Sequence, residues 1–280
     1  MKFAVFSHYS STNIGNEIQS IAAEKLLPQV DIHIPKMSIY QGEPVLLVMN
    51  AFFGEQVAFP PSPLITPFYI AMHICPSVQH KYATTECINH FKQHQPIGCR
   101  DKGTMQFLQG LGIEAYYSGC LTLTLPLREN RGLHNYAVDY PRKNKYYKGK
   151  MYENRSSCVT TTHRHNFAPL GSEVAFQMAR NLLTEYQTAK QIYTSRLHCA
   201  LPSAAMGIPV TYLGVHDRRT DCLLELGDRL ELPPLKWRYA IRKPNLIHVQ
   251  LDQDKVQKHK QKLIANFNER LKKLLNETFA

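Results

Sequence analysis

The sequence predicts an α/β protein with parallel strands, on two observations. Short apolar runs alternate with segments in which apolar residues recur at helical spacing. Polar turns follow the apolar runs and lead into the helical segments, which is the order of elements in parallel α/β units. With 280 residues, the chain is long enough for two modest domains, because a domain averages roughly 150 residues.

The first turn of this kind follows an apolar strand at residues 2–8. A polar loop at 10–17 leads into a helix that Pro28 ends. A helix N-terminus offers free N–H groups, so this turn is a candidate site for an anion or a sugar. The residues at this turn are Asn13, Gly15, Asn16 and Glu17. The turn has no GxGxxG pattern, so a dinucleotide site is not indicated.

The rest of the first half reads as further strands and helices. Strands are expected at 30–34, 45–49, 68–74 and 96–99, with a strand and turn at 115–125. Helices are expected at 84–93 and 103–112, and the proline-rich segment 60–67 is expected to be a loop. His73 falls near a strand end, where a buried core histidine is the simpler interpretation of this residue taken alone.

Arg100 and Asp101 stand where the strand at 96–99 meets the next helix. Asp101 is the expected N-cap of that helix, and an ion pair with Arg100 is the alternative. Arg100 places a permanent cation at a strand end. The end of this strand is therefore a second candidate anion site.

Composition changes between residues 126 and 155, where basic residues are interleaved with tyrosines. Such a segment could bind nucleic acid, an anionic glycan or lipid headgroups. A solvated connector with one strand near 136–139 is the more ordinary interpretation. We place the domain junction here, which gives expected domains at 1–126 and 127–250, followed by a terminal helix at 251–280.

The second half repeats the pattern of strand, turn and helix. The strand at 157–161 ends in Thr162-His163-Arg164-His165, which lacks the glutamate of a zinc-protease HExxH motif. After Gly171, apolar residues at helical spacing predict an amphipathic helix: Ala175, Met178, Ala179, Leu182, Leu183 and Tyr186. This helix leads to a strand at 191–193, so a parallel, right-handed crossover is expected.

Arg196 and His198 make the next turn the most informative part of the chain. They lie in a predicted turn at 194–202, which precedes a short helix at 203–207. A permanent cation beside a group that titrates near neutral pH describes an anion site with a built-in acid or base. A capping arginine and a satisfied core histidine are the alternative interpretation. After the following strand, a loop with Asp217 could lie at the same sheet edge.

The C-terminal part is expected to hold a short helix at 223–226, a strand at 246–249 and the basic amphipathic helix at 251–280. This helix could contact a membrane through its apolar face. In the favoured interpretation it packs back over the first domain. Its apolar residues are Leu263, Ile264, Phe267, Leu271, Leu274 and Leu275.

Charge and cysteine content narrow the classes of function. The net charge of +11 fits small phosphorylated or acidic substrates, an anionic membrane or nucleic acid, in that order, and without a nucleic-acid motif we expect no nucleic-acid partner. Seven cysteines without a CxxC pair favour reduced thiols over disulfides or a zinc site. We expect neither a signal peptide nor a transmembrane helix, hence a cytoplasmic protein, with peripheral contact to the inner face of a membrane left open.

Three parts of the sequence, in this order, resemble the polysaccharide pyruvyl transferase family. They are Asn13-Ile14-Gly15-Asn16-Glu17-Ile18-Gln19, then Gly98-Cys99-Arg100-Asp101 with residues 118–124, then Thr194-Ser195-Arg196-Leu197-His198 with Gly207-Ile208-Pro209-Val210. The resemblance implies two Rossmann-like domains that face each other across a cleft, as in GT-B glycosyltransferases. It also implies phosphoenolpyruvate as donor and, as acceptor, a sugar of a cell-surface polysaccharide such as a capsule or exopolysaccharide, or of its lipid-linked precursor.

The resemblance assigns to the donor site Arg196, Leu197 and His198, with Arg100 as a second cation. We add Ser195 and Arg164 as donor-binding residues. The expected acceptor-binding residues are Asn13, Gly15, Asn16, Glu17 and His73. His198 is the expected general acid and His163 the weaker candidate for the base, which Asp217 or Glu17 could replace. No step of ketal formation calls for a metal or a cofactor.

Two other functions are compatible with the sequence. A nucleotide-sugar glycosyltransferase of the same architecture would use Arg100 and Arg196 to bind a diphosphate. A non-catalytic relative would bind an anionic glycan or a membrane through the basic connector and the terminal helix. Stabilisation by nucleoside diphosphates but not by phosphoenolpyruvate would favour the glycosyltransferase.

Overall fold

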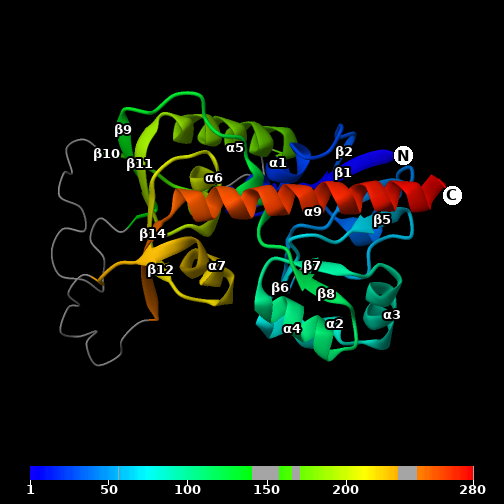
Figure 1. The fold of residues 1–280 in the computed structure, drawn as a ribbon. Helices are drawn as coiled ribbons and strands as arrows, with labels where there is room; N and C mark the ends of the chain where they lie inside the picture. Colours follow the sequence, from blue (N-terminus) through cyan, green and yellow to red (C-terminus); the bar gives the residue numbers. More distant parts are fainter. Residues whose placement is uncertain (56, 141–157, 166–170, 233–244, 280) are drawn as a thin grey trace.

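The computed structural model describes residues 1–55, 57–140, 158–165, 171–232 and 245–279. Two larger sheets carry helices packed against them, and one long helix runs along both (Figure 1). The chain is therefore a mixed α/β protein with parallel strands, as the alternation of apolar runs and helical segments predicts.

The first larger sheet is parallel, in the order β2-β1-β3-β5. Its strands are β1 (Lys2–Phe6), β2 (Ile32–Ile34), β3 (Val45–Val48) and β5 (Ile65–Phe68). Every residue of β3 is buried, as in parallel sheets that are covered on both faces. Pro67 lies inside β5, so the expected loop at 60–67 was wrong at its C-terminal end. A proline is tolerated there because β5 is the last strand of this ladder.

Two short parallel pairs lie beside this sheet. β4 (Phe52–Phe53) pairs with β6 (His73–Ile74), and β7 (Ile97–Cys99) pairs with β8 (Ala115–Tyr117). The Gly98 N–H donates to the Tyr69 carbonyl at 3.1 Å, and the Met72 N–H donates to the Gly98 carbonyl at 3.0 Å. Strand β7 therefore lies next to the continuation of β5, and Arg100 follows it directly.

The helices of the first half are α1 (Gly15–Glu24), η1 (Met37–Ile39), η2 (Pro76–Val78), α2 (Gln79–Tyr82), α3 (Thr85–Gln93) and α4 (Lys102–Gly110). Asp101 caps α4 by accepting a hydrogen bond from the Thr104 N–H, which confirms the predicted N-cap. Of the strand and turn expected at 115–125, the strand is β8 (Ala115–Tyr117) and does not extend into residues 118–125. That segment holds the short helix η3 (Leu121–Thr124), where the Thr124 hydroxyl donates to the Leu121 carbonyl at 2.7 Å and so favours a turn.

The second larger sheet has six strands in the order β10-β9-β11-β12-β14-β13. Its strands are β9 (His134–Val138), β10 (Cys158–Thr161), β11 (Ala189–Thr194), β12 (Val210–Val215), β13 (Gly227–Arg229) and β14 (Leu246–Leu251). The strands from β10 to β12 are parallel, whereas β14 and β13 are antiparallel to their neighbours. The parallel strands bring the ends of β9, β11 and β12 to one edge. Residues 141–157, which hold most of the basic tyrosine-rich connector, lie outside the described residues.

The helices of the second half are α5 (Gly171–Gln187), α6 (Leu197–Ala205), η5 (Arg218–Thr220) and α7 (Asp221–Leu226). The spacing that predicts α5 matches the face it buries, which includes Ala175, Ala179, Leu182, Leu183 and Tyr186. Helix α1 packs beside α5, where the Arg180 Nη2 atom lies 2.7 Å from the Glu24 Oε2 atom.

Helix α6 begins at Leu197, six residues earlier than the sequence suggests. Pro202 inside it has no N–H to donate to the His198 carbonyl, and His198 adopts the non-helical angles φ −83° and ψ 16°. The proline that favours a turn in the sequence therefore produces a kink within the helix. As a result, His198 lies in the irregular first turn of α6.

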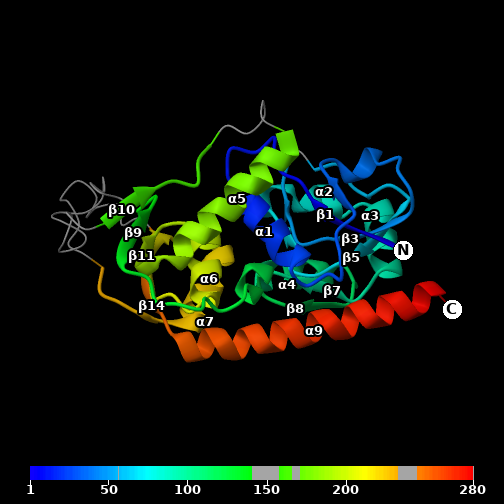
Figure 2. The ribbon, with the colours of Figure 1, turned by 90° about the horizontal axis from the view of Figure 1, so that it is seen from above.

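Helix α9 (Gln253–Phe279) lies along both halves of the chain (Figure 2). Its Phe267 ring packs 5.0 Å from the Phe68 ring, between centroids. Its Lys260 Nζ donates to the carbonyls of Leu125 at 2.5 Å and Ala205 at 3.2 Å. The helix therefore packs on both halves, whereas packing over the first domain alone was expected. Within the described residues, no helix is long and apolar enough to span a membrane.

Candidate active site

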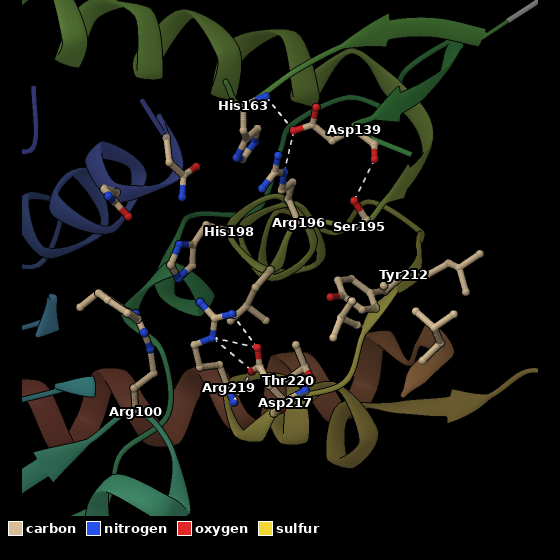
Figure 3. Close-up of a pocket in the computed structure, with 18 of the residues that line it drawn as sticks. Arg100, Asp139, His163, Ser195, Arg196, His198, Tyr212, Asp217, Arg219 and Thr220 are labelled. Carbon is tan, nitrogen blue, oxygen red and sulfur yellow. Dashed lines mark hydrogen bonds and ion pairs between the residues drawn. The ribbon is translucent and has the colours of Figure 1, made fainter. Parts of the chain in front are cut away.

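Most of the predicted site residues line one cavity of about 840 Å³ (Figure 3). Residues of the first half at its wall are Ser11, Asn13, Asn16, Phe52 and Arg100. Residues of the second half are Asp139, His163, Ser195, Arg196, Leu197, His198, Tyr212, Leu213, Gly214, Val215, Asp217, Arg219, Thr220 and Leu246. Most of them follow the carboxyl ends of parallel strands, where open α/β sheets bind ligands.

Arg196 is held by Asp139, which follows β9. The Arg196 Nε donates to the Asp139 Oδ2 at 2.7 Å, and the same carboxylate accepts from the Thr162 hydroxyl and the His163 N–H at 2.6 and 3.0 Å. Burial raises the pKa of Asp139, but these hydrogen bonds and the Arg196 charge outweigh it and keep the pKa below its usual value. The ionised Asp139 therefore fixes the guanidinium at the cavity wall.

The backbone around Asp139 contributes to this arrangement. Asp139 has a φ of +48°, a region that residues other than glycine rarely adopt. Its carbonyl accepts a hydrogen bond from the Ser195 hydroxyl at 2.8 Å. The Arg196 N–H donates to the Thr194 hydroxyl at 3.0 Å. Both strand ends, β9 and β11, are thus tied together where Arg196 enters the cavity.

His198 places its imidazole at the cavity wall. Its Nε2 atom is buried and has no hydrogen-bond partner among the described residues. Burial, followed by the positive charge of Arg100, holds the pKa of His198 well below its usual value. The ring is therefore neutral at pH 7 while the cavity is empty. An anion beside it would reverse part of this shift.

His163 lies deeper in the wall and is 1 % exposed. Its Nε2 atom lies 2.6 Å from the Tyr186 hydroxyl oxygen. Burial lowers the pKa of His163 to about 3. Its Nδ1 atom faces α1, because a Cβ added at Gly15 would lie 3.2 Å from it and 3.0 Å from the His198 Cβ. Gly15 therefore lets α1 approach both histidines.

Arg100 is the most deeply buried cation at the cavity, with 3 % of its surface exposed. Its Nη1 donates to the Gln19 side-chain oxygen at 2.5 Å, and its Nε has no hydrogen-bond partner among the described residues. Burial lowers the pKa of Arg100 from its usual high value. A buried guanidinium with an unused donor is costly unless a ligand accepts from it.

Asp217 and Arg219, which follow β12, form another ion pair at the cavity wall. The Arg219 Nη2 lies 2.6 Å from the Asp217 Oδ2, and the Arg219 Nε lies 3.1 Å from each carboxylate oxygen. Burial raises the pKa of Asp217, but the Arg219 guanidinium outweighs it and lowers the pKa below its usual value. The Arg219 guanidinium also lies 5.9 Å from the Phe52 ring centroid.

The expected acceptor residues divide into two groups. Asn13 and Asn16 line the cavity, next to Ser11. Gly15, Glu17 and His73 do not line it, and the side chains of Glu17 and His73 are each 1 % exposed. The Glu17 Oε1 accepts from the His8 N–H at 2.7 Å, and burial raises the pKa of this carboxyl to about 7.

His73 and Arg164 are also separated from the cavity. The His73 Nδ1 lies 2.6 Å from the Asp101 Oδ2, and burial lowers the pKa of His73 to about 4. Arg164 is exposed, and its backbone forms a β-bridge with Asn13. Among the described residues, no three His, Cys, Asp or Glu side chains are grouped as a metal site.

Several residues of the cavity wall were not predicted from the sequence. These are Ser11, Phe52, Asp139, Tyr212, Leu213, Gly214, Val215, Arg219, Thr220 and Leu246. The sequence held a signal for five of them. Asp139 ends a predicted strand, and Gly214, Val215, Arg219 and Thr220 lie in the loop that was expected at the same edge as Arg196.

The fold and the site together define an α/β protein that presents guanidinium and imidazole groups to a ligand cavity at its strand ends. A sequence model of the family described as polysaccharide pyruvyl transferase matches residues 73–217. The match covers more than half of the chain, so the protein belongs to the polysaccharide pyruvyl transferase family, as its motifs predict. The matched segment includes Arg100, His163, Arg196, His198 and Asp217.

Two further comparisons say less about function. A search of curated proteins found no match to the chain. A functionally uncharacterised protein of Klebsiella pneumoniae is similar in structure, with 10% sequence identity and a TM-score of 0.42, over 75% of this chain and 82% of the Klebsiella chain.

Proposed function

We propose that the protein transfers pyruvate from phosphoenolpyruvate onto two hydroxyls of a sugar as a ketal, with release of phosphate. Family membership supports a role in pyruvyl transfer. The observation that carries the donor assignment is the cavity at the strand ends, where Arg100, Arg196 and the unpaired His198 imidazole lie together. Phosphoenolpyruvate carries a carboxylate and a phosphate on one small carbon frame, and two guanidiniums can bind one each.

The contacts of the two arginines support this division. Arg196 uses its Nε for Asp139, and no hydrogen bond among the described residues occupies its two terminal amino groups. Those groups form the fork that binds a carboxylate or a phosphate in bidentate geometry. Arg100 has an unused Nε donor. Each arginine therefore has a donor left for the ligand.

His198 is our choice for the general acid. Donor binding would place negative charge next to an imidazole whose pKa burial and Arg100 now lower, so proton uptake would accompany binding. The imidazolium then protonates the methylene carbon of the donor, and the adjacent carbon becomes an oxocarbenium centre. One sugar hydroxyl adds, the carbon–oxygen bond to phosphate breaks, and the second hydroxyl closes the ketal. Of the two hydroxyl protons, one restores the proton that His198 gave to the carbon and the other leaves with the phosphate.

Asp217 is the better placed candidate for the base. It lines the cavity, whereas Glu17 lies behind the wall. His163 is close to the site, but its Nε2 atom lies 2.6 Å from the Tyr186 hydroxyl oxygen and its Nδ1 atom faces α1, which leaves it the weaker candidate. The proposed reaction uses neither a metal nor a cofactor.

The acceptor would enter from the side of Asn13 and Asn16, whose amides can bind sugar hydroxyls. In this proposal the chain would form two Rossmann-like domains of the GT-B type, with the acceptor on residues 1–126 and the donor mainly on residues 127–250. The acceptor would be a glycan of a cell-surface polysaccharide or its lipid-linked precursor. Ser195 would support the donor through its bond to Asp139.

The test is phosphate release from phosphoenolpyruvate with a panel of glycan acceptors. We expect release only with a suitable acceptor, and a loss of at least about a hundredfold in Arg196→Ala and His198→Ala. Arg229→Ala, which removes an exposed arginine of β13, should retain full turnover. Normal turnover in either site variant would contradict the assignment. Thermal stabilisation by nucleoside diphosphates but not by phosphoenolpyruvate would point to a glycosyltransferase instead.

A further inference from the structure

Two consecutive arginines after β12 reach different parts of the molecule. The Arg218 Nε lies 3.2 Å from the Oδ1 of Asp101, and its Nη2 donates to the Ile74 carbonyl. Gly103 leaves room for this side chain, since a Cβ there would lie 2.7 Å from the Arg218 Cδ. Arg219 instead lines the cavity near His198 (Figure 3).

Asp101 fixes Arg218 to the first half of the chain. It is 2 % exposed, and its Oδ2 lies 2.6 Å from the His73 Nδ1 and accepts from the Thr104 hydroxyl at 2.8 Å. The Thr104 N–H donates to its Oδ1 at 2.9 Å. The backbone of η5 is therefore anchored to β6 and α4. With the backbone of the turn anchored, a change of partner by Arg219 would be a rotation of its side chain.

Asp217 keeps other partners if Arg219 leaves it. Its Oδ1 accepts from the Arg219 backbone N–H at 2.8 Å, and its own N–H donates to the Thr220 hydroxyl at 3.0 Å. These bonds form the capping box of η5. The carboxylate would thus remain held and partly satisfied after it lost the guanidinium.

The positive charge of Arg219 acts on two other groups at the cavity, His198 and Arg100. Its charge adds to burial and to Arg100 in disfavouring the protonated form of His198. It also disfavours the charged form of Arg100, whose own burial is the larger effect. These cations repel one another across the cavity, so an anion between them would relieve the repulsion.

We propose that Arg219 is a third anion-binding residue of the cavity, paired with Asp217 when the cavity is empty and transferred to the donor phosphate on binding. The proposal rests on the proposed function and adds a residue that follows the family match, which ends at residue 217. A phosphate carries about two negative charges and three acceptor oxygens, against one charge on Asp217. The phosphate is therefore the stronger partner for the guanidinium fork.

Calorimetric titrations of phosphoenolpyruvate and of inorganic phosphate test the proposal. We expect Arg219→Gln to weaken both affinities about tenfold or more, because it removes a charge-assisted contact. Asp217→Asn should strengthen both several-fold, because asparagine still caps η5 but no longer competes for Arg219. Arg219→Lys, which keeps the charge but not the fork, should fall between wild type and Arg219→Gln. Arg229→Gln should bind as wild type does.

The outcomes separate this proposal from the proposed function. If wild type binds phosphoenolpyruvate and both Arg219 variants bind it equally well, the proposal is overturned while the donor assignment stands. Weaker binding in Asp217→Asn also overturns it. Wild type could instead bind phosphate but not phosphoenolpyruvate. If the phosphate affinity then decreases from Asp217→Asn through wild type to Arg219→Gln, the anion transfer is supported and the donor assignment fails. If wild type binds neither phosphoenolpyruvate nor phosphate, both the anion transfer and the donor assignment are overturned.

Discussion

At the residue scale, burial sets the protonation state of the groups behind the cavity wall. It lowers the pKa of His163 to about 3 and of His73 to about 4, so both rings are neutral at pH 7. It raises the pKa of Glu17 to about 7, against a hydrogen bond from the His8 N–H that lowers it. His163 and His73 therefore support the wall in their neutral forms, whereas Asp139 and Asp217 are charged because arginines pair with them.

Glu17 gives a prediction with a definite sign. Its folded pKa lies above the unfolded value, so the carboxyl destabilises the fold increasingly as pH rises from about 4.5 through 7. Glu17→Gln should therefore gain stability relative to wild type between pH 5.5 and pH 8, by about 2 kcal/mol at 1.36 kcal/mol per pKa unit. Urea unfolding of both proteins at the two pH values measures this difference. A difference that stays constant or shrinks with pH would show that the carboxyl is ionised in the fold.

At the element scale, the site depends on the close approach of α1 to α6. Gly15 begins α1, and a Cβ there would lie 3.0 Å from the His198 Cβ, closer than most real Cβ contacts. We expect Gly15→Ala to reduce turnover about tenfold, because the new Cβ would displace His198 by a few tenths of an ångström and catalysis is sensitive to the position of reacting groups. Gly110→Ala in α4 is the matched control, since a Cβ there meets nothing within 4 Å. Circular dichroism should show both variants folded. Equal turnover in the two variants would remove the steric argument.

Local patterns predicted most of the elements that hold the site. Helical spacing predicted α5, and the Asp101 cap and the strand ahead of Arg196 followed from short-range rules. The start of α6 did not, because Pro202 favours a turn in a sequence but here only kinks the helix at His198. Short-range rules also cannot tell that Pro67 lies inside a strand. A strand tolerates a proline at the edge of a sheet, and the edge position of β5 depends on its pairing with the distant β3.

Contacts between residues far apart in the chain could not be predicted from the sequence. Asp139 and Arg196 are 57 residues apart, and Arg218 meets Ile74 across 144 residues. Glu17 and His73 carry the residue types of a sugar site, but the fold turns both into the interior. The direction of a side chain at a strand end depends on neighbours from other elements, which no local pattern encodes.

At the scale of the whole molecule, the cavity draws on both halves of the chain. Arg100 follows β7 of the first half, and Arg196 and His198 follow β11 of the second. One core cluster contains buried side chains from both halves and from α9. Helix α9 crosses from α6 to β5 through Lys260 and Phe267 (Figure 2). Any ligand in the cavity therefore contacts groups whose relative position this packing determines.

The central claim is that the cavity joins the carbon frame of phosphoenolpyruvate to a sugar. Nuclear magnetic resonance with carbon-labelled phosphoenolpyruvate and a panel of glycans measures this directly. The account predicts that the label appears in a ketal carbon bound to two oxygens of one sugar, in equal amount to the phosphate released. Label that ends in free pyruvate, or phosphate release that does not depend on any acceptor, would contradict it.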